Sequence, residues 1–568
     1  MLFLASNNTT LGEAPHYEAH RSYIVPASKA SCSYIMKLEW DEMCIFVRQN
    51  PKCHEFEWLI NWMYFMFCEM DMDTTTFTTM IAIIVGIVLL IILSLVIISF
   101  VRMAPCFLAT AHLLRFDEHS AGSVYLVLLT YGGDVIENAH IFNVDTSTAF
   151  NETLGSAIFT LAVFGGALAV VNQFALTPAY FVRDTVFALF GLIFTTVVYV
   201  HEEIDLHYAL IFMGIYFLYL VYVVVEFLIH QALYKVESKH SQERGLDFSI
   251  DDMAPAHQPI QLKFEVNDSL QYGELEGPNT FLFKQFFTSL NPIRLDVMKE
   301  MNTFFKCCFL VGMPLHVIYI LCIPCFDYKL PNHGWSKLTI CVNLVVAGPI
   351  LVSLFTFSGT PYIFAWIPGT LLAVAVFFTS RTDRPPKYHI AFAFLGVIMC
   401  MAFHFVLEHE LMNLFHNLGL FMGIRRQTIG LSFLAWADNI TLAVWISRLA
   451  DWGYSRTSFA AVYMGVLLDM IYSLGLIFTI KCRNSWKYSV HTRQGVSGPT
   501  SSIYAIFLYG FVFFGVSICK FQVRKSLGVA LLLYYFIYLL HSYLVEFEVI
   551  HGMGTDHSGV VYVGAKWA

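Results

Sequence analysis

The feature that most constrains this chain is an apolar stretch with no charged residue, FTTMIAIIVGIVLLIILSLVIISFV, at residues 77–101. A helix rises about 1.5 Å per residue, so roughly 20 apolar residues cross a hydrocarbon core of about 30 Å. Backbone N–H and C=O groups in hydrocarbon need internal partners, and a continuous rather than alternating run provides them only as a helix. The stretch therefore predicts a membrane-spanning helix.

The whole chain has the composition that such a helix requires. Of its 568 residues, 57% are hydrophobic and only 13% are charged, against about 45–50% and 25% in soluble domains. Its net charge of −9 leaves no basic patch, so nucleic acid is not an expected partner, and no phosphate-binding loop or dinucleotide fingerprint is present. These features predict an all-α polytopic membrane protein. The further candidate spans lie at about 121–142, 154–174, 182–200, 207–231, 304–325, 338–357, 362–379, 388–410, 429–447, 457–480, 502–519 and 526–548.

Three segments are expected outside the membrane. Residues 1–76 carry Cys32, Cys44, Cys53 and Cys68 and the glycosylation sequons at Asn7 and Asn8, which predicts a disulfide-held segment of a glycoprotein on the oxidising side; four free thiols are the alternative. Residues 232–302 form a hydrophilic loop with seven Lys or Arg between Lys235 and Lys299, so the positive-inside rule puts this expected regulatory loop in the cytoplasm or the mitochondrial matrix. Residues 549–568 are a C-terminal tail.

The membrane part divides into two similar halves, 77–231 and 388–548, joined through an interfacial segment and two linking spans at 303–387. In each half a plain span is followed by one that polar and acidic residues interrupt, which is typical of secondary transporters with inverted-topology repeats. Opposite orientation of the two interrupted helices requires an even number of crossings between the halves. We therefore expect twelve crossings, with 304–325, which contains Pro314 and Pro324, lying in the interface.

The interrupted helix of the first half reads AGSVYLVLLTYGGDVIENAHIF and contains several oxygen-bearing side chains. Gly132 and Gly133 are expected to let it unwind, and Asp134, Glu137 and Asn138 follow at a spacing that puts them on one helix face. Two carboxylates inside a bilayer are costly, and a divalent cation relieves that cost; Ca²⁺ prefers six to eight hard oxygens. Thr130 is a candidate auxiliary ligand. The alternative is that the acidic pair lies in water at the end of the span.

The second half offers a similar set of oxygens. Asp438, Asn439 and Thr441 interrupt the span at 429–447, and Asp469 lies in the next helix. A single buried aspartate is often only a structural hydrogen-bonding group, but clusters in both halves favour a transported-cation site with Thr441 as an auxiliary ligand. A catalytic metal at His404 and Glu408 is the weaker interpretation of the neighbouring helix, so we expect a transporter and not an enzyme.

At these segments the chain resembles the cation/calcium exchanger superfamily, and in particular its mitochondrial sodium/calcium exchanger branch. The family motif A-G-V-T-F-L-A-L-G-N-G-A-P-D aligns with AGSVYLVLLTYGGD, which ends at Asp134, and L-A-W-G-N-S-I-G-D aligns with LAWADNITL, where Leu442 replaces the acidic residue. CIFVRQNPKC, LNP at 290–292, MPLHVIYILCIP, FAFLG and VEFEVIHG also look like this branch, so the resemblance covers most of the chain in order.

The resemblance implies an antiporter that exchanges Ca²⁺ for Na⁺, Li⁺ or H⁺ by alternating access, with no permanently bound cofactor and with homo-oligomers left open. Helices 77–101 and 388–410 would rock against the rest. Leu442 favours the alternative, a transport-inactive or selectivity-altered relative that acts as a regulatory membrane protein. The family branch implies the inner mitochondrial membrane, whereas the sequons and cysteines, without a clear transit peptide, favour the plasma membrane or secretory pathway.

Overall fold

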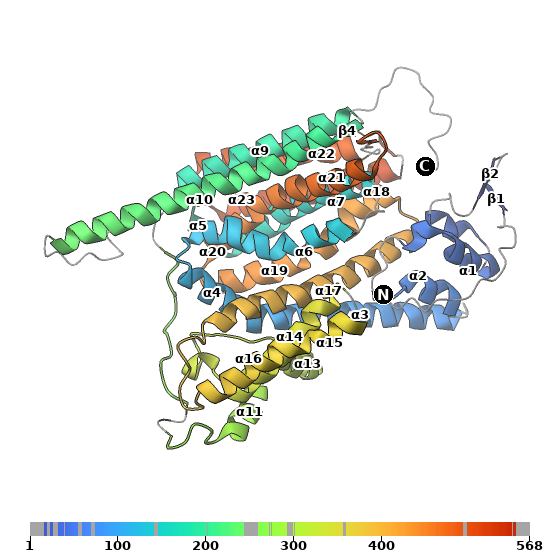
Figure 1. Cartoon of the computed structure of the whole chain (residues 1–568). Coiled ribbons are helices and arrows are strands. Elements are labelled where there is room, and N and C mark those ends of the chain that lie inside the picture. Colours follow the sequence, from blue (N-terminus) through green and yellow to red (C-terminus); the bar gives the residue numbers. More distant parts are fainter. Residues whose placement is uncertain are drawn as a thin grey trace.

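The computed structural model is a bundle of long helices whose axes run roughly side by side (Figure 1). The structure describes residues 16–19, 23–26, 32–38, 40–54, 59–69, 74–140, 146–201, 203–243, 259–271, 273, 275–291, 299, 302–355, 359–491, 497–547 and 549–552. The side chains of some of these residues, 134–140 among them, lie outside that description.

The N-terminal segment and the first half alternate short irregular elements with long apolar helices, many of them continuous with the next. The bounds are β1 His16–Ala19, β2 Tyr23–Pro26, η2 Cys32–Lys37, α1 Trp40–Gln49, η3 Pro51–His54, α2 Trp62–Tyr64, η4 Phe65–Glu69, α3 Thr74–Ile98, η5 Ser99–Met103, α4 Ala104–Leu113, α5 Glu118–Ser120, η6 Ala121–Leu126, α6 Val127–His140, α7 Thr146–Phe159, η7 Thr160–Gly165, α8 Gly166–Val171, β3 Phe174–Ala175, α9 Pro178–Val200, β4 Glu203–Asp205 and α10 Leu206–Glu243.

The linking region and the second half follow the same plan. The bounds are α11 Leu282–Leu290, α13 Thr303–Cys322, η9 Pro331–Gly334, α14 Lys337–Ser353, α15 Gly359–Phe364, α16 Trp366–Thr379, α17 Ala391–Phe421, α18 Arg426–Ile429, η10 Gly430–Leu434, α19 Ala435–Asp451, α20 Ser455–Val466, η11 Leu467–Ser473, α21 Leu474–Asn484, β5 Ser489–His491, α22 Gly498–Ile518, β6 Gln522–Val523 and α23 Lys525–Glu546. The short strands pair antiparallel as β1–β2, β3–β6 and β4–β5.

Twelve helical stretches among the described residues are long and apolar enough to cross a membrane. They include α13 but not α5–η6–α6, whose end is followed by residues outside the description. The prediction of an all-α polytopic fold is therefore confirmed, while the interfacial position of 304–325 stays a prediction. The predicted span 388–410 ends too early, because α17 continues to Phe421.

The two interrupted helices run in opposite senses, as inverted repeats require. In Figure 1, α5 lies at the left end and α6 continues to the right, whereas α18 lies at the right and α19 continues to the left. Equivalent glycines mark their packing on the opposite half. A Cβ on Gly122 would lie 2.1 Å from the carbonyl oxygen of Thr457, and one on Gly430 would lie 3.1 Å from that of Thr148. The two threonines lie near the starts of α20 and α7, so the contacts are reciprocal.

The irregular parts of these helices are not where the sequence predicted them. We expected Gly132 and Gly133 to unwind the first helix, but α6 continues through both residues. The irregularity is instead a π-helical segment just before, η6, and the second half has its counterpart in η10. π-Helical segments also interrupt the following helices, as η7 and η11. A π-helical turn shifts the register of a helix without breaking it and is frequent at functional sites.

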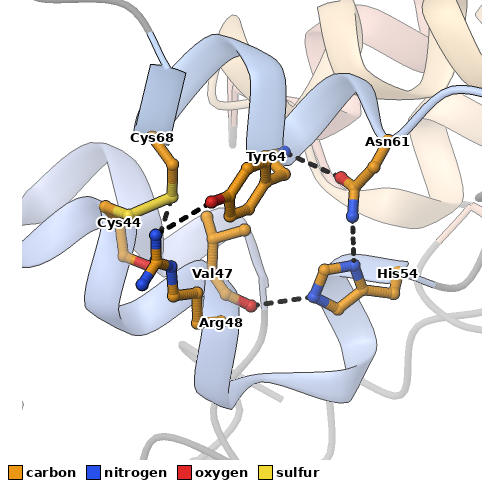
Figure 2. Close-up of a disulfide and its surroundings, with 7 residues drawn as sticks. All are labelled: Cys44, Val47, Arg48, His54, Asn61, Tyr64 and Cys68. Atoms are coloured by element: carbon orange, nitrogen blue, oxygen red, sulfur yellow. Dashed lines mark hydrogen bonds between the residues drawn. A yellow bond between two sulfur atoms is a disulfide. The ribbon is translucent and has the colours of Figure 1, made fainter. Parts of the chain in front are cut away.

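The N-terminal segment forms a small cap that two disulfides hold, Cys32–Cys53 and Cys44–Cys68. In Figure 2, His54 accepts a hydrogen bond from Asn61 at Nδ1 and donates from Nε2 to the carbonyl oxygen of Val47, 2.9 Å away. The cap contacts α17 through Glu410, which accepts hydrogen bonds from the Leu59 N–H at 2.6 Å and the Trp62 indole at 3.0 Å. The end of α10 that leads into the hydrophilic loop at residues 232–302 lies at the opposite end of the bundle from the cap (Figure 1). We call that end of the bundle the loop side.

The glycosylation sequons have different outcomes. Asn7 and Asn8 lie outside the described residues. Asn151 lies within α7, and its side chain is completely buried. A glycan on Asn151, which begins the third sequon Asn-Glu-Thr, is therefore incompatible with this fold, because the tripeptide pattern carries no information about burial.

The described part of the hydrophilic loop at residues 232–302, called the central loop from here on, lies across the loop-side ends of the helices. Pro259 bridges to Asp117 at the start of α5. Lys263 forms an ion pair of 2.5 Å with Glu118, and its backbone N–H donates to the Tyr454 hydroxyl between α19 and α20. These contacts connect the loop to both interrupted helices, which is the position that a regulatory loop needs. The regulatory role itself stays a prediction.

Candidate functional site

Two carboxylates meet inside the bundle, and both come from the second half. Asp438 lies on α19 and Asp469 on the π-helical segment η11, with side chains that are 8% and 7% exposed. They are near enough to interact through their charges. Placing two like charges together in a poorly hydrated site is unfavourable unless a cation or a proton compensates them. The pair is therefore a candidate cation site.

The first half contributes to the same site through Ser156 on α7. Its hydroxyl lies 3.2 Å from Oδ2 of Asp438, to which it donates, and it also interacts with the carboxyl group of Asp469. Gly155 next to it allows α7 to approach closely, because a Cβ there would lie 2.5 Å from the carbonyl oxygen of Leu431 in η10. The close approach of the backbones thus brings a first-half hydroxyl between the two second-half carboxylates.

Asn439 holds these groups in place with its amide nitrogen. Nδ2 donates toward the Ser156 hydroxyl at 2.7 Å, the Ala435 carbonyl oxygen at 2.8 Å and Oδ2 of Asp438 at 3.0 Å. The Ala435 carbonyl oxygen can only accept a hydrogen bond, and so can Oδ2 of Asp438 when that carboxylate is ionised. The amide nitrogen, which is the donor, must therefore face these two atoms. Its oxygen faces the other way and accepts from the Tyr131 hydroxyl at 3.2 Å.

Tyr131 comes from α6, the interrupted helix of the first half, and is 2% exposed. Its ring lies against Gly465 of α20, where a Cβ would come within 2.6 Å of the ring. The residue occupies a position where the family motif has glycine, and Asn439 occupies the corresponding position of the second motif. The two interrupted helices therefore touch through equivalent residues.

The other predicted site residues have varied outcomes. Asp134, Glu137 and Asn138 lie on α6, but their side chains are outside the description, so their role stays a prediction. The hydroxyl of Thr130 donates to the Leu126 carbonyl oxygen of its own helix at 2.9 Å. The Thr441 hydroxyl is buried, and no hydrogen-bond partner for it is found within the described part of the chain.

Sequence reasoning missed Ser156 and Tyr131. Ser156 follows a glycine at the start of the candidate span 154–174, and small residues in a membrane helix indicate a close approach of a neighbouring helix. Tyr131 stands directly inside the interrupted segment, but the predicted ligands were acidic, amide and threonine side chains only. The potential metal site at His404 has a structural explanation instead. His404 lies 3.0 Å from the Ser99 hydroxyl and 3.4 Å from the Trp445 indole nitrogen.

A cavity of about 560 Å³ opens at the loop-side ends of the helices. Its lining includes Glu118 at the start of the first interrupted helix, Asn172 beyond α8, Lys263 of the central loop and Arg456 of α20. Most of these side chains are charged or polar, so the cavity is suited to hydrated ions. It lies at the beginning of the helix that carries Tyr131 and beside the end of the helix that carries Asp438.

Comparisons with known proteins give a consistent result. A family model described as "Sodium/calcium exchanger protein" matches residues 392–544. The chain is 24% identical to the mitochondrial sodium/calcium exchanger protein of Homo sapiens, with 94% of each chain covered. It is 25% identical to the protein of the same name from Gallus gallus, with 92% of each covered. A solved structure of the sodium-calcium exchanger NCX_Mj, soaked with 10 mM Na⁺ and zero Ca²⁺, matches with 10% identity and a TM-score of 0.39 over 81% of this chain and 99% of that one.

The twelve apolar helices and the two oppositely oriented interrupted helices agree with the fold that the resemblance implies (Figure 1). Over 94% of its length, the chain resembles the mitochondrial sodium/calcium exchanger branch of the cation/calcium exchanger superfamily.

Proposed function

We propose that this protein is a secondary active antiporter that exchanges Ca²⁺ for Na⁺, or for Li⁺ or H⁺, across a membrane. The observation that carries the proposal is the meeting of Asp438 and Asp469 with Ser156 of the opposite half where two inverted helices touch. Carboxylate and hydroxyl oxygens are the ligands that Ca²⁺ and Na⁺ prefer. A site built from both halves opens to one side and then the other when the halves rock, which is the principle of alternating access.

Several further features are part of the proposal. Asp134, Glu137 and Asn138 are proposed to complete the oxygen set from α6, with Thr130 and Thr441 as auxiliary ligands. Helices α3 and α17 are proposed to rock, and the loop at 232–302 to regulate them. The relatives are named mitochondrial, and with the family resemblance this supports the inner mitochondrial membrane over the plasma membrane, with the disulfide-held cap in the intermembrane space and the loop in the matrix.

The test is ion flux in liposomes that contain the purified full-length protein. The wild type is expected to take up Ca²⁺ when a Na⁺, Li⁺ or H⁺ gradient is imposed, and each ion is varied in turn with K⁺ as a further comparison. Asp438→Asn and Asp469→Asn are each expected to lower the initial rate by at least about tenfold, because each removes a charged ligand at membrane depth. Asp134→Asn is expected to have the same effect.

Asp451→Asn is the matched control, because Asp451 is exposed at the end of the same helix as Asp438. It should leave the rate unchanged. No flux from the wild type under any gradient would contradict the antiporter and favour the transport-inactive regulatory relative that Leu442 suggests. Flux that survives Asp438→Asn would reject the site but not the activity.

A further inference from the structure

The amide group of Asn439 is oriented as a donor in this structure, although carboxamides bind cations only through their oxygen. Its nitrogen faces Asp438, Ser156 and the Ala435 carbonyl, and its oxygen accepts from Tyr131. An amide turned the other way would put its oxygen against the Ala435 oxygen and the Asp438 carboxylate, which is repulsive. In this state, Asn439 therefore supports Asp438 and does not offer a ligand to an ion.

We propose that Tyr131 is a positioning residue of the cation site, whose hydroxyl holds the Asn439 oxygen away from the ion in the empty protein. A cation that uses this oxygen must first displace the tyrosine hydroxyl. Tyr131 thus weakens cation binding and keeps the empty site ordered at the point where the two interrupted helices touch. This inference rests on the proposed function.

The packing around Tyr131 fixes the position of its ring in the described structure. The side chain is buried, and its ring lies where any side chain larger than hydrogen at Gly465 would collide with it. The ring and its hydroxyl are therefore held by packing as well as by the bond to Asn439. Removing only the hydroxyl keeps the packing and releases the Asn439 oxygen, which makes Tyr131→Phe a selective test.

Tyr131→Phe is expected to lower the Ca²⁺ concentration for half-maximal flux about three- to tenfold. The empty variant has a buried amide oxygen without its donor, and a bound cation can satisfy that oxygen, so binding becomes more favourable. The thermal stability of the Ca²⁺-free protein is expected to fall and the stabilisation by added Ca²⁺ to grow. A residue with a merely structural role would lower stability without improving the half-maximal concentration.

Two further variants complete the experiment. Tyr538→Phe is the control, because Tyr538 is equally buried and loses a comparable hydroxyl contact, 3.1 Å to Ser501 between α22 and α23. It should not change the Ca²⁺ dependence. Asn439→Leu is the second variant: in its background Tyr131→Phe is expected to give no decrease in the half-maximal concentration, because the oxygen that Tyr131→Phe releases is then absent.

The outcomes separate the two proposals. Flux by the wild type with an unchanged or raised half-maximal concentration in Tyr131→Phe would overturn the role of Tyr131 alone. The same decrease in the Asn439→Leu background would also overturn it. A wild type that shows neither flux nor stabilisation by Ca²⁺ would overturn both the role of Tyr131 and the antiport function.

Discussion

The two interrupted helices have matching backbones and different chemistry. Both contain a π-helical segment near the start and pack a glycine within it, Gly122 or Gly430, on a backbone carbonyl of the opposite half. At the position where both family motifs have asparagine, the first half has Thr130, whose hydroxyl bonds within its own helix, and the second has Asp438, which bonds Ser156 across the halves. The second half thus supplies the described acidic pair, while the first supplies Ser156 and Tyr131.

This difference indicates that the shape of the repeat and the chemistry of the site are separate requirements. The backbone of each half must fit its inverted partner, so glycines and π-helical segments are repeated in equivalent places. The ion needs only a sufficient set of oxygens at one point, and either half can provide them. The chain has Leu442 where the family motif has an acidic residue. This replacement is compatible with a cation site, because Asp438 and Asp469 provide negative charge from neighbouring positions.

The largest expected effect concerns the matched glycines. Gly122→Ala would force a methyl group to within 2.1 Å of a backbone oxygen, which no rotamer change relieves, whereas Gly430→Ala meets one at 3.1 Å. Overpacking of this kind costs about 1–3 kcal/mol or more. We expect Gly122→Ala to abolish monodisperse protein in detergent and Gly430→Ala to lower thermal stability only modestly, as measured by size-exclusion chromatography after heating.

Gly86→Ala is the control for these variants, because no atom of the described residues lies within 4 Å of the added Cβ in α3. Alanine is favoured over glycine in a helix by up to about 1 kcal/mol, so this variant should be neutral or slightly stabilising. Equal tolerance of alanine at Gly122 and Gly430 would show that the close contact in the first half is not as tight as the structure has it.

Much of the fold was predictable because the membrane demands long apolar helices with paired backbones. The inverted orientation followed from the polar interruptions in both halves, and the disulfides from the cysteines ahead of the first span. The π-helical segments were not predictable, because they depend on how a helix fits the opposite half and not on its own composition. The same reason explains the incorrect expectation that Gly132 and Gly133 would unwind.

The sequence indicated the acidic residues of the second half as candidates, since carboxylates at membrane depth are costly unless they are paired or bound to a cation, and their role stays a prediction. Asp438, Asn439 and Asp469 all lie in one network. What the sequence could not provide is the direction of the hydrogen bonds. Asn439 was expected as a ligand, but its orientation depends on Tyr131, Ser156 and Ala435, which come from three different elements.

A second prediction concerns the cap, which lies at only one end of the bundle. The cap therefore distinguishes the first long helix of each half, α3 and α17, from the other. Glu410 of α17 is 6% exposed and accepts two hydrogen bonds from the cap. Glu410→Ala leaves the Leu59 N–H and the Trp62 indole without this acceptor, which costs about 1–3 kcal/mol. We expect faster proteolysis of the cap and a lower melting temperature.

Glu42→Ala is the matched control, because Glu42 is exposed on α1 of the same cap. It should leave both the proteolysis rate and the melting temperature unchanged. Glu410→Gln should retain part of the stability, since an amide oxygen can still accept one of the two bonds. Proteolysis of Glu410→Ala at the wild-type rate would show that the disulfides and apolar contacts hold the cap on α17 without Glu410.

The smallest expected effect compares the two predicted auxiliary threonines. The Thr441 hydroxyl is buried without a hydrogen-bond partner among the described residues, whereas the Thr130 hydroxyl bonds to Leu126. Thr441→Val removes an unsatisfied polar group and should stabilise the Ca²⁺-free protein by about 1 kcal/mol. If that hydroxyl binds the cation, the same variant raises the half-maximal Ca²⁺ concentration several-fold.

Thr130→Val should change this concentration less, because the Thr130 hydroxyl already donates to the Leu126 carbonyl oxygen. Opposite shifts of stability and affinity in Thr441→Val, measured by thermal unfolding and by flux, would identify a hydroxyl kept for the ion; a loss of both would assign it a structural role.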